Sequence, residues 1–296
     1  MSAHKTPTVS VLVTIYNREH ILQETVESIL NSTYQDYELI LVDDCSKDKS
    51  YQIACELAKA DSRIHAYKNP ENLGDYGNRN AAAAKARGKY IKYVDADDLV
   101  YPHTLEVMVN AMERFPEAAL ALSINKIDLP QPFPFYTSAG DAMRAHFNGS
   151  SLFGVGPTAA IIRNDAFTEV GGFSGRQFIG DTELWYKLTE RWPLVSLPPA
   201  LVWWRQHEGQ QMRLELKTPQ VLNIRNNLEI ETLEATQHLN DSEKKRIAQR
   251  IRQTHARRLL SMMLKRKSPG IAWKTFQDSG LTFPELLQGF KGYPKG

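Results

Sequence analysis

Acidic side chains gather where two apolar runs of the sequence end. The first run leads into Asp43 and Asp44, and the second leads into Asp95, Asp97 and Asp98. Carboxylates that share a site raise one another's pKa unless a cation or hydrogen-bond donors stabilise them. Mg²⁺ and Mn²⁺ prefer carboxylate oxygen and are commonly shared with substrate phosphates. The pattern therefore predicts a divalent-cation site, and the alternative is a pair of solvated loops with Asp in turn and helix N-cap positions.

The acidic ends belong to a chain that alternates between strand and helix patterns. Short apolar or β-branched runs, typical of strands buried in a parallel sheet, cover residues 9–15, 39–42, 63–67 and 90–94. Apolar residues at helical spacing follow the first strand and recur within 46–60, and 75–87 is compatible with a third helix. This order predicts an α/β fold with a mostly parallel central sheet, flanking helices and right-handed crossovers. Ligands of such sheets bind beyond the carboxyl ends of the strands, where the acidic residues lie.

The composition is that of a folded globular protein. Of 296 residues, 42% are hydrophobic and 24% are charged, which excludes collagen-like, coiled-coil and mostly disordered chains. A net charge of +2 gives no reason to expect a nucleic-acid partner. No membrane-spanning run or signal peptide is recognisable, and two cysteines without metal-site spacing favour a reducing compartment. We therefore expect a cytoplasmic protein.

The pattern changes to helices near the C-terminus. Helical runs are predicted over 221–238 and 242–267, so we expect a main domain over 1–210 and a helical extension over 211–296. The second run is basic and amphipathic. This predicts either peripheral contact with the inner face of the cell membrane or packing on the main domain with a solvated basic face. Residues 126–157, which are rich in proline, are expected to form an irregular functional loop over the cleft.

Several short motifs occur together in a fixed order. They are Thr14-Ile15-Tyr16-Asn17-Arg18, Val42-Asp43-Asp44-Cys45-Ser46, Asn72-Leu73-Gly74 with Arg79-Asn80, Asp95-Ala96-Asp97-Asp98, Gly156-Pro157-Thr158, Val170-Gly171-Gly172-Phe173 and Asp181-Thr182-Glu183-Leu184-Trp185. Over residues 7–208 this set resembles the family-2 glycosyltransferases. The resemblance implies the GT-A fold, with a Rossmann-like sheet, and inverting transfer of a sugar from a nucleotide-diphospho-sugar. It also implies a donor half over about 7–100 and an acceptor half over about 101–210.

The resemblance implies roles for individual residues. The implied donor-binding residues are Thr14, Tyr16, Arg18, Asp44, Arg79, Asp95 and Asp97, of which Asp44 corresponds to the residue that accepts a hydrogen bond from the base. The implied ligands of Mn²⁺ or Mg²⁺ are Asp97, Asp98 and His207, and the implied general base is Asp181. The family often has Glu before this Asp, whereas this chain has Gly180, and Glu183 is a reserve base.

Each of these side chains also has a structural interpretation. Tyr16 can be an aromatic residue packed at a strand end, and Arg79 can be an exposed helix residue that pairs with Asp75 at i−4. Asp181 can be a helix N-cap, and His207 can be an ordinary surface or cap residue.

Three functions follow, in order of preference. The first is an inverting, metal-dependent glycosyltransferase of polysaccharide or glycan synthesis, with a UDP-sugar as the expected donor and a glycan or lipid-linked saccharide as the acceptor. The second is a catalytically silent protein that binds a nucleotide sugar. The third is a nucleotidyltransferase, which is disfavoured because no Gly-rich phosphate loop with a basic residue lies near the N-terminus. The donor sugar, the linkage and the oligomeric state stay open.

Overall fold

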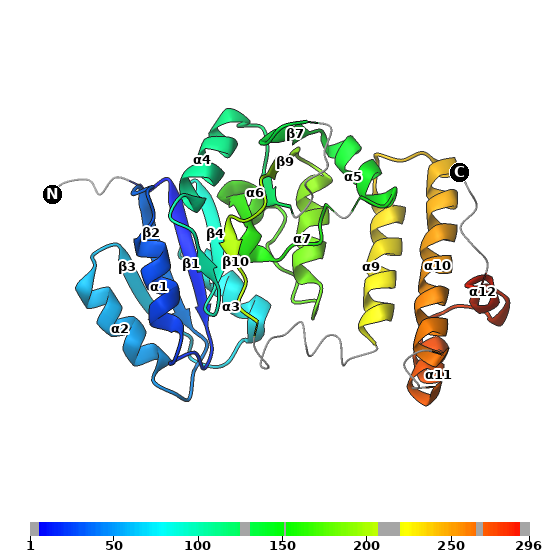
Figure 1. Cartoon of the computed structure of the whole chain (residues 1–296), viewed down its shortest axis with the longest axis horizontal. Coiled ribbons are helices and arrows are strands. Elements are labelled where there is room, and N and C mark those ends of the chain that lie inside the picture. Colours follow the sequence, from blue (N-terminus) through cyan, green and yellow to red (C-terminus); the bar gives the residue numbers. More distant parts are fainter. Residues whose placement is uncertain (1–5, 125–130, 151, 207–219, 265–268, 291–296) are drawn as a thin grey trace. The chain divides into compact units, whose positions relative to one another are not determined.

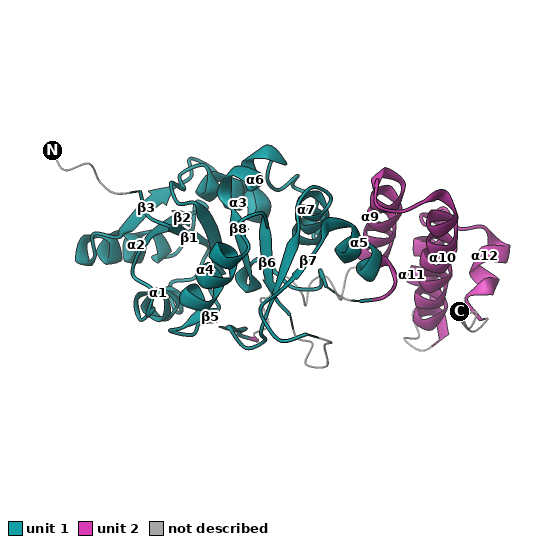
Figure 2. Cartoon of the chain, turned by 90° about the horizontal axis from the view of Figure 1, so that it is seen from above, with its two compact units in different colours: residues 1–146, 150–205 teal, residues 147–149, 206–296 magenta. Residues whose placement is uncertain are grey.

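The computed structural model describes residues 6–124, 131–150, 152–206, 220–264 and 269–290. The chain divides into two compact units, coloured separately in Figure 2. Unit 1 comprises residues 1–146 and 150–205, and unit 2 comprises residues 147–149 and 206–296. Each unit is described separately below.

Unit 1 is built on a twisted sheet whose first half is parallel. Its strands are β1 (Val9–Ile15), β2 (Tyr37–Asp43), β3 (Ile64–Lys68) and β4 (Tyr90–Asp95), in the order β3-β2-β1-β4 (Figure 1). All seven residues of β2 are buried, which explains why its sequence is nearly continuous in apolar residues. In the register of the sheet Thr14 lies opposite both Val42 and Asp95, so the ends of β1, β2 and β4 share one edge.

The second half of the sheet is mixed. Its strands are β6 (Leu120–Ser123), β7 (Phe135–Thr137), β8 (Ala160–Arg163) and β9 (Leu194–Leu197), and the order continues from β4 as β8-β6-β9-β7. Strand β8 is antiparallel to both β4 and β6, whereas β6 and β9 are parallel. A separate pair joins β5 (Leu99–Val100) to β10 (Val202–Trp203).

Helices cover both faces of the sheet. The apolar sides of α1 (Leu22–Leu30), α2 (Ser50–Ala60) and α4 (Thr104–Arg114) join one core cluster with alternate residues of β1, such as Val11 and Val13. On the other face α3 (Gly74–Ala83) contacts β1 and β2. The remaining helical segments of unit 1 are α5 (Ala139–Phe147), a 3₁₀ turn over Pro157–Ala159, α6 (Asn164–Glu169) and α7 (Gly180–Thr189).

The predicted fold class is confirmed, and one predicted segment is wrong in part. The chain has the expected α/β architecture with a mostly parallel sheet, flanking helices and C-terminal helices. Within the segment 126–157, however, β7 pairs with β9 and α5 follows directly. The prolines hid this short strand, because a strand at the end of a sheet needs ladder partners on one side only and therefore tolerates proline nearby. Residues 125–130 lie outside the described part.

Unit 2 is helical. Its elements are α9 (Val221–Ala235), α10 (Asp241–Leu264), α11 (Pro269–Gln277) and α12 (Phe283–Gln288), and α10 packs against the other three. The buried residues of α10 include Ile247, Ile251, Leu259 and Met262. Within the described residues, no helix combines the length and the apolar character needed to cross a membrane.

Candidate active site

Three carboxylates converge where β4 ends. Asp95 is the last residue of β4, and the Asp98 amide donates a hydrogen bond to the Asp95 carbonyl at 2.9 Å, which closes a tight turn. This turn places one oxygen each of Asp95, Asp97 and Asp98 within 4.8 Å of one another. The set consists of hard oxygen ligands, which is the donor chemistry that Mg²⁺ and Mn²⁺ prefer. The predicted metal side chains Asp97 and Asp98 are therefore brought together, and Asp95 joins them.

Asp98 is the buried member of the cluster, with 3% of its surface exposed. The Arg205 amide donates a hydrogen bond to its carboxylate at 3.2 Å, and the Thr158 side chain also bonds to it. Burial, together with the charges of Asp95 and Asp97, nevertheless raises the pKa of Asp98 to about 7. A carboxylate with this pKa gains from a bound cation, so Asp98 fits a metal ligand.

A buried lysine is connected to the acidic turn through Thr158. Lys92 of β4 is fully buried, and its ammonium donates a hydrogen bond to the Thr158 carbonyl. Burial lowers the pKa of Lys92 to about 7, an effect that the nearby charges of Asp95 and Asp98 oppose. The Thr158 hydroxyl in turn accepts a hydrogen bond from the Asp95 amide at 3.1 Å. Thr158 therefore links Lys92 to both ends of the acidic turn.

Arg79 connects α3 to the acidic turn. Its guanidinium contacts Asp75 at 2.9 Å, the predicted i−4 pair, and Asp95 at 2.8 Å. The residue is only 6% exposed, so the interpretation of Arg79 as an exposed helix residue is wrong. Its Nη1 is buried without a hydrogen-bond partner among the described residues. This unsatisfied donor beside a carboxylate cluster fits a phosphate or sugar oxygen of a ligand.

The loop after β1 reaches the same place. Arg18 forms an ion pair with Asp97 at 3.2 Å, and its Nη1 donates to the Tyr16 carbonyl at 3.3 Å. Tyr16 is 43% exposed, so it is not packed into the core as its structural interpretation required. Thr14 is half-buried on β1, opposite Asp95. The three predicted donor-binding residues of this loop thus lie along the edge that carries the acidic turn.

Asp44 organises the neighbouring loop. It is 2% exposed, and its carboxylate accepts hydrogen bonds from the amides of Leu73 and Gly74, each at 2.9 Å. The Asn69 side-chain amide adds a third bond at 2.8 Å. These bonds tie the end of β2 to the start of α3, where Gly74 has a φ of +74° that favours glycine. Asp44 therefore positions α3 and the Arg79 that it carries.

Asp181 lies in the first turn of α7. The helix N-cap is Ile179, so the interpretation of Asp181 as the N-cap is wrong. The Asp181 carboxylate accepts a hydrogen bond from the Thr182 amide at 2.7 Å and is half-buried. The reserve base Glu183 is engaged by the Ser174 hydroxyl and by Lys187 at 3.7 Å. Both acids thus have hydrogen-bond or ion-pair partners on or beside α7.

Tyr76 explains why the acid that often precedes this Asp is missing. The Gly180 amide donates to the Tyr76 hydroxyl at 2.9 Å, and the buried Tyr76 ring stacks on Phe173 at 5.1 Å. A Cβ on Gly180 would lie 2.7 Å from the Tyr76 ring, closer than packed atoms approach. A glutamate therefore has no room at position 180. Because Tyr76 and Arg79 share α3, this helix touches both the start of α7 and the acidic turn.

We expect Gly180→Ala to lower the stability of the protein by about 1 to 3 kcal/mol, because the added methyl group must displace the buried Tyr76 ring. Thermal unfolding measures the change. Gly156→Ala is the matched control, since a Cβ there meets nothing within 4 Å. In a Tyr76→Leu background the cost of Gly180→Ala should largely disappear, and an undiminished cost would contradict the steric explanation.

Three residues of the site escaped the sequence interpretation, and one predicted residue is not described. Thr158 belongs to the Gly156-Pro157-Thr158 motif and Arg205 lies two residues before His207, but the sequence assigns neither of them to the acidic turn, and for Lys92 it indicates only a position in a strand. Arg205 also donates from its Nε to the Asp97 carbonyl at 2.9 Å. His207 lies outside the described residues.

Comparison with known proteins agrees with this fold and identifies the family. The sequence profile of glycosyl transferase family 2 matches residues 10–171. Glycosyltransferase GlyG of Streptococcus pneumoniae serotype 4 is 30% identical over 224 residues, which cover 70% of this chain and 73% of GlyG. The putative teichuronic acid biosynthesis glycosyltransferase TuaG of Bacillus subtilis is 37% identical over 106 residues, which cover 36% of this chain and 42% of TuaG. The match to TuaG thus spans less than half of that relative.

Solved structures share the fold at low sequence identity. Residues 1–349 of TarS from S. aureus superpose with a TM-score of 0.68 at 18% identity, covering 95% of this chain and 80% of that one. The mannosyltransferase PcManGT from Pyrobaculum calidifontis, in complex with GDP-Man and Mn²⁺, superposes with a TM-score of 0.56 at 16% identity, covering 97% and 84%. The family profile covers more than half of the chain, and GlyG matches over most of both lengths. The chain therefore belongs to glycosyl transferase family 2 and is a glycosyltransferase.

Proposed function

We propose that the protein transfers a sugar, with inversion and with a divalent metal, from a nucleotide-diphospho-sugar to an acceptor hydroxyl. The observation that carries this proposal is the convergence of Asp95, Asp97 and Asp98 within 4.8 Å, beside the unsatisfied donor of buried Arg79. An anionic diphosphate needs cationic partners, and this edge of the sheet provides arginine together with a metal-type ligand set.

The donor is assigned to the edge formed by β1, β2 and β4. We propose that Thr14, Tyr16 and Arg18 line the base and ribose and that Asp95 lies nearer the ribose or sugar. The implied hydrogen bond from the base to Asp44 would have to reach a carboxylate that is 2% exposed and already accepts three hydrogen bonds. The free Nη1 of Arg79 is suited to the diphosphate. TarS has been crystallised with UDP-GlcNAc, and PcManGT with GDP-Man, so relatives of this fold hold different bases. We propose a UDP-sugar as the donor of this chain, with uracil as the base.

Asp97 and Asp98 are the proposed ligands of Mn²⁺ or Mg²⁺, and His207 stays a third proposed ligand. A bound divalent ion would neutralise charge that develops on the leaving diphosphate. Arg18 holds Asp97 at 3.2 Å, so this ion pair must loosen or share the carboxylate when a cation binds. The PcManGT complex with Mn²⁺ supports the assignment by analogy of fold.

Asp181 is the proposed general base. An inverting transfer needs a carboxylate that takes the proton from the acceptor hydroxyl as that oxygen attacks the anomeric carbon. Asp181 lies in the first turn of α7, and the Tyr76–Gly180 hydrogen bond fixes the start of this helix against α3. The hydroxyl oxygen forms the new bond to the sugar, and the diphosphate leaves with the bonding electrons.

We further propose a role in polysaccharide or glycan synthesis, in the cytoplasm, with a glycan or lipid-linked saccharide as acceptor. The similarity to TuaG, a putative glycosyltransferase of teichuronic acid biosynthesis, supports such a role. Residues 1–210 are assigned to transfer and residues 211–296 to an extension, in keeping with the division of the chain near residue 205.

A thermal-stability panel of nucleoside diphosphates tests the donor site. One nucleotide should stabilise the protein in the presence of Mn²⁺, by about 2.7 kcal/mol at a hundred times its Kd, and less without the ion. Release of that nucleotide from its sugar conjugates is then measured. Stabilisation without turnover would favour a silent nucleotide-sugar-binding protein. No stabilisation by any nucleotide with Mn²⁺ would contradict the proposed site.

A further inference from the structure

The apolar side of the basic helix α10 is already occupied. Leu259, Leu260 and Met262 are at most 8% exposed and belong to one cluster with residues of α11 and α12. Ile247 and Ile251 are buried as well. Most of the apolar stripe of this helix therefore forms the core of unit 2 and is not available for the predicted membrane contact; Leu264, at the end of the helix, is the exposed exception.

Apolar side chains are exposed instead along α12. Phe283, Leu287 and Phe290 are 57%, 46% and 63% exposed, and they recur at i, i+4 and i+7. The turn continues past α12, because the Phe290 amide donates to the Leu287 carbonyl at 3.1 Å. Thr282 and Glu285 form a capping box that fixes the start of the helix. We call Phe283, Leu287 and Phe290 the α12 stripe.

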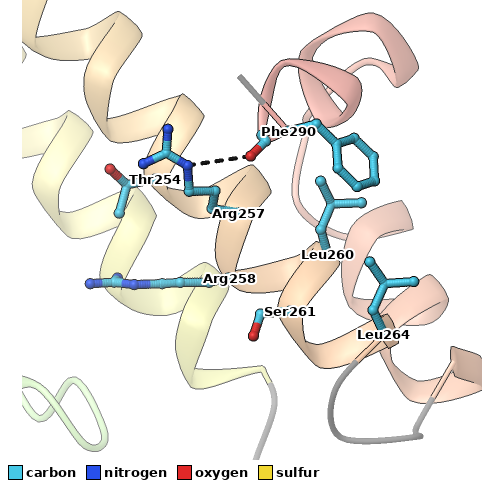
Figure 3. Close-up of a pocket in the computed structure, with 8 residues that line it drawn as sticks. Thr254, Arg257, Arg258, Leu260, Ser261, Leu264 and Phe290 are labelled. Atoms are coloured by element: carbon cyan, nitrogen blue, oxygen red, sulfur yellow. Dashed lines mark hydrogen bonds between the residues drawn. The ribbon is translucent and has the colours of Figure 1, made fainter. Parts of the chain in front are cut away.

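A groove with cationic and hydroxyl groups adjoins one end of this stripe. It has a volume of about 460 Å³ and includes Arg257, Arg258, Leu264 and Phe290 in its lining (Figure 3). Leu264 is 67% exposed. Ser261 and Thr254 add hydroxyl groups to the same wall. Arginine, hydroxyl and apolar side chains thus meet in one groove on the surface of unit 2.

The contact between α10 and the end of α12 fixes this arrangement. Arg257 Nε donates to the Gly289 carbonyl at 3.3 Å, as the dashed line in Figure 3 marks. A Cβ on Gly289 would lie 2.9 Å from the backbone of Ala256 and Arg257, so the two backbones touch. Phe290 follows directly and is therefore held near Arg257, whereas the Arg258 side chain extends away from the Phe290 ring (Figure 3).

The charge of this region differs from that of the rest of the chain. Residues 241–290 contain 11 Lys and Arg against 4 Asp and Glu, out of 36 and 34 in the whole sequence. The remaining residues therefore contain 25 basic and 30 acidic side chains. This stretch of the sequence therefore carries a net positive charge although the whole protein is nearly neutral, and two of its arginines, Arg257 and Arg258, line the same groove as Phe290. A neutral or basic partner surface would not complement the positive charge of this region.

We propose that the α12 stripe and the groove beside Arg257 bind the surface of an anionic lipid bilayer. The phenylalanine and leucine side chains enter the boundary between headgroups and acyl chains, while Arg257 and Arg258 contact lipid phosphates. An exposed apolar row beside concentrated positive charge is the combination that interfacial binding requires. This inference concerns unit 2 alone and does not depend on the proposed transfer chemistry.

Vesicle co-sedimentation of the full-length chain tests the proposal. The protein should bind vesicles of phosphatidylcholine with phosphatidylglycerol, and bind phosphatidylcholine alone at least tenfold more weakly. The triple variant Phe283→Ser, Leu287→Ser and Phe290→Ser should bind the anionic vesicles at least tenfold less. These side chains are exposed, so the fold should persist, and thermal unfolding of unit 2 together with nucleotide release checks that it does.

Variants of the two arginines measure the electrostatic contribution to vesicle binding separately from the apolar contribution. Arg257→Gln with Arg258→Gln should weaken binding to anionic vesicles by about fivefold for each arginine, whereas the Lys pair at both positions should restore it. Lys59→Gln with Arg114→Gln removes two exposed cations of unit 1 and is the matched control. Wild-type binding by the triple variant, or equal binding to neutral vesicles, would overturn the proposal. Self-association that depends on the α12 stripe, without vesicle binding, would assign the surface to a second copy of the chain and overturn it too.

Discussion

Replacing Asp181 by Asn should slow sugar transfer by about 10²- to 10⁴-fold, which is the usual contribution of a general base. The amide keeps the size of the side chain but cannot take the acceptor proton. Donor binding should be nearly unchanged, because none of the proposed donor residues lies on α7. The measurement is the initial rate of transfer together with nucleotide-induced thermal stabilisation.

Glu183→Gln is the matched control for this variant. Glu183 lies two residues further along α7 and is engaged by Ser174 and Lys187, so its replacement should change the rate little. Tyr76→Phe removes the hydrogen bond to the Gly180 amide and should produce an intermediate loss. A wild-type rate in Asp181→Asn, with a large loss in Glu183→Gln, would exchange the two roles.

Replacing Asp98 by Asn should reduce metal-dependent transfer by about 10²- to 10³-fold, because the side chain loses its charge as a metal ligand. The same change should alter the pH dependence of metal binding. The pKa of Asp98 is raised to about 7 by burial and by the charges of Asp95 and Asp97. Since a bound cation requires the ionised carboxylate, apparent Mn²⁺ affinity should fall as the pH drops below about 7.

The direction of this effect follows from linkage. Below its pKa, Asp98 is protonated in the free protein, so binding must release that proton, and affinity falls by about tenfold for each pH unit. Titration of Mn²⁺ by calorimetry between pH 5 and 8, with nucleotide present, gives the slope. Asp278→Asn removes an exposed carboxylate of unit 2 and should leave the slope of Mn²⁺ affinity against pH unchanged. A flat pH profile in the wild-type protein would contradict a role for Asp98 as a ligand.

Local sequence patterns are sufficient to predict where the strands of the parallel half of the sheet lie. The run 9–15 matches β1 residue for residue, β2 extends the predicted run 39–42 by two residues before it and one after it, and β4 extends the run 90–94 by one residue. Buried strands and amphipathic helices leave a period in the sequence that does not depend on distant contacts. The acidic turn was also predictable, because three carboxylates within four residues stay close whatever the rest of the chain does.

The environment of that turn was decided by tertiary structure. Thr158 and Arg205 approach Asp98 from 60 and 107 positions along the sequence, and no local pattern shows that β8 and β10 will deliver them. The burial of Arg79 has the same origin, since Asp95 meets it 16 residues away. Gly180 departs from the family motif, and the reason is tertiary: the ring of Tyr76, 104 residues away, fills the space beside it.

The C-terminal helices also show which features the sequence predicts and which only the packing decides. Sequence alone identified α9 and α10 and the positive charge of the region, because both depend on composition and period. It left open whether the apolar stripe of α10 contacts a membrane or packs on the main domain, and the structure buries most of those residues within unit 2, where α10 packs against α9, α11 and α12. An amphipathic pattern shows that a helix has an apolar side but not what covers it. Only the packing of unit 2 leaves the side chains of Phe283, Leu287 and Phe290 exposed.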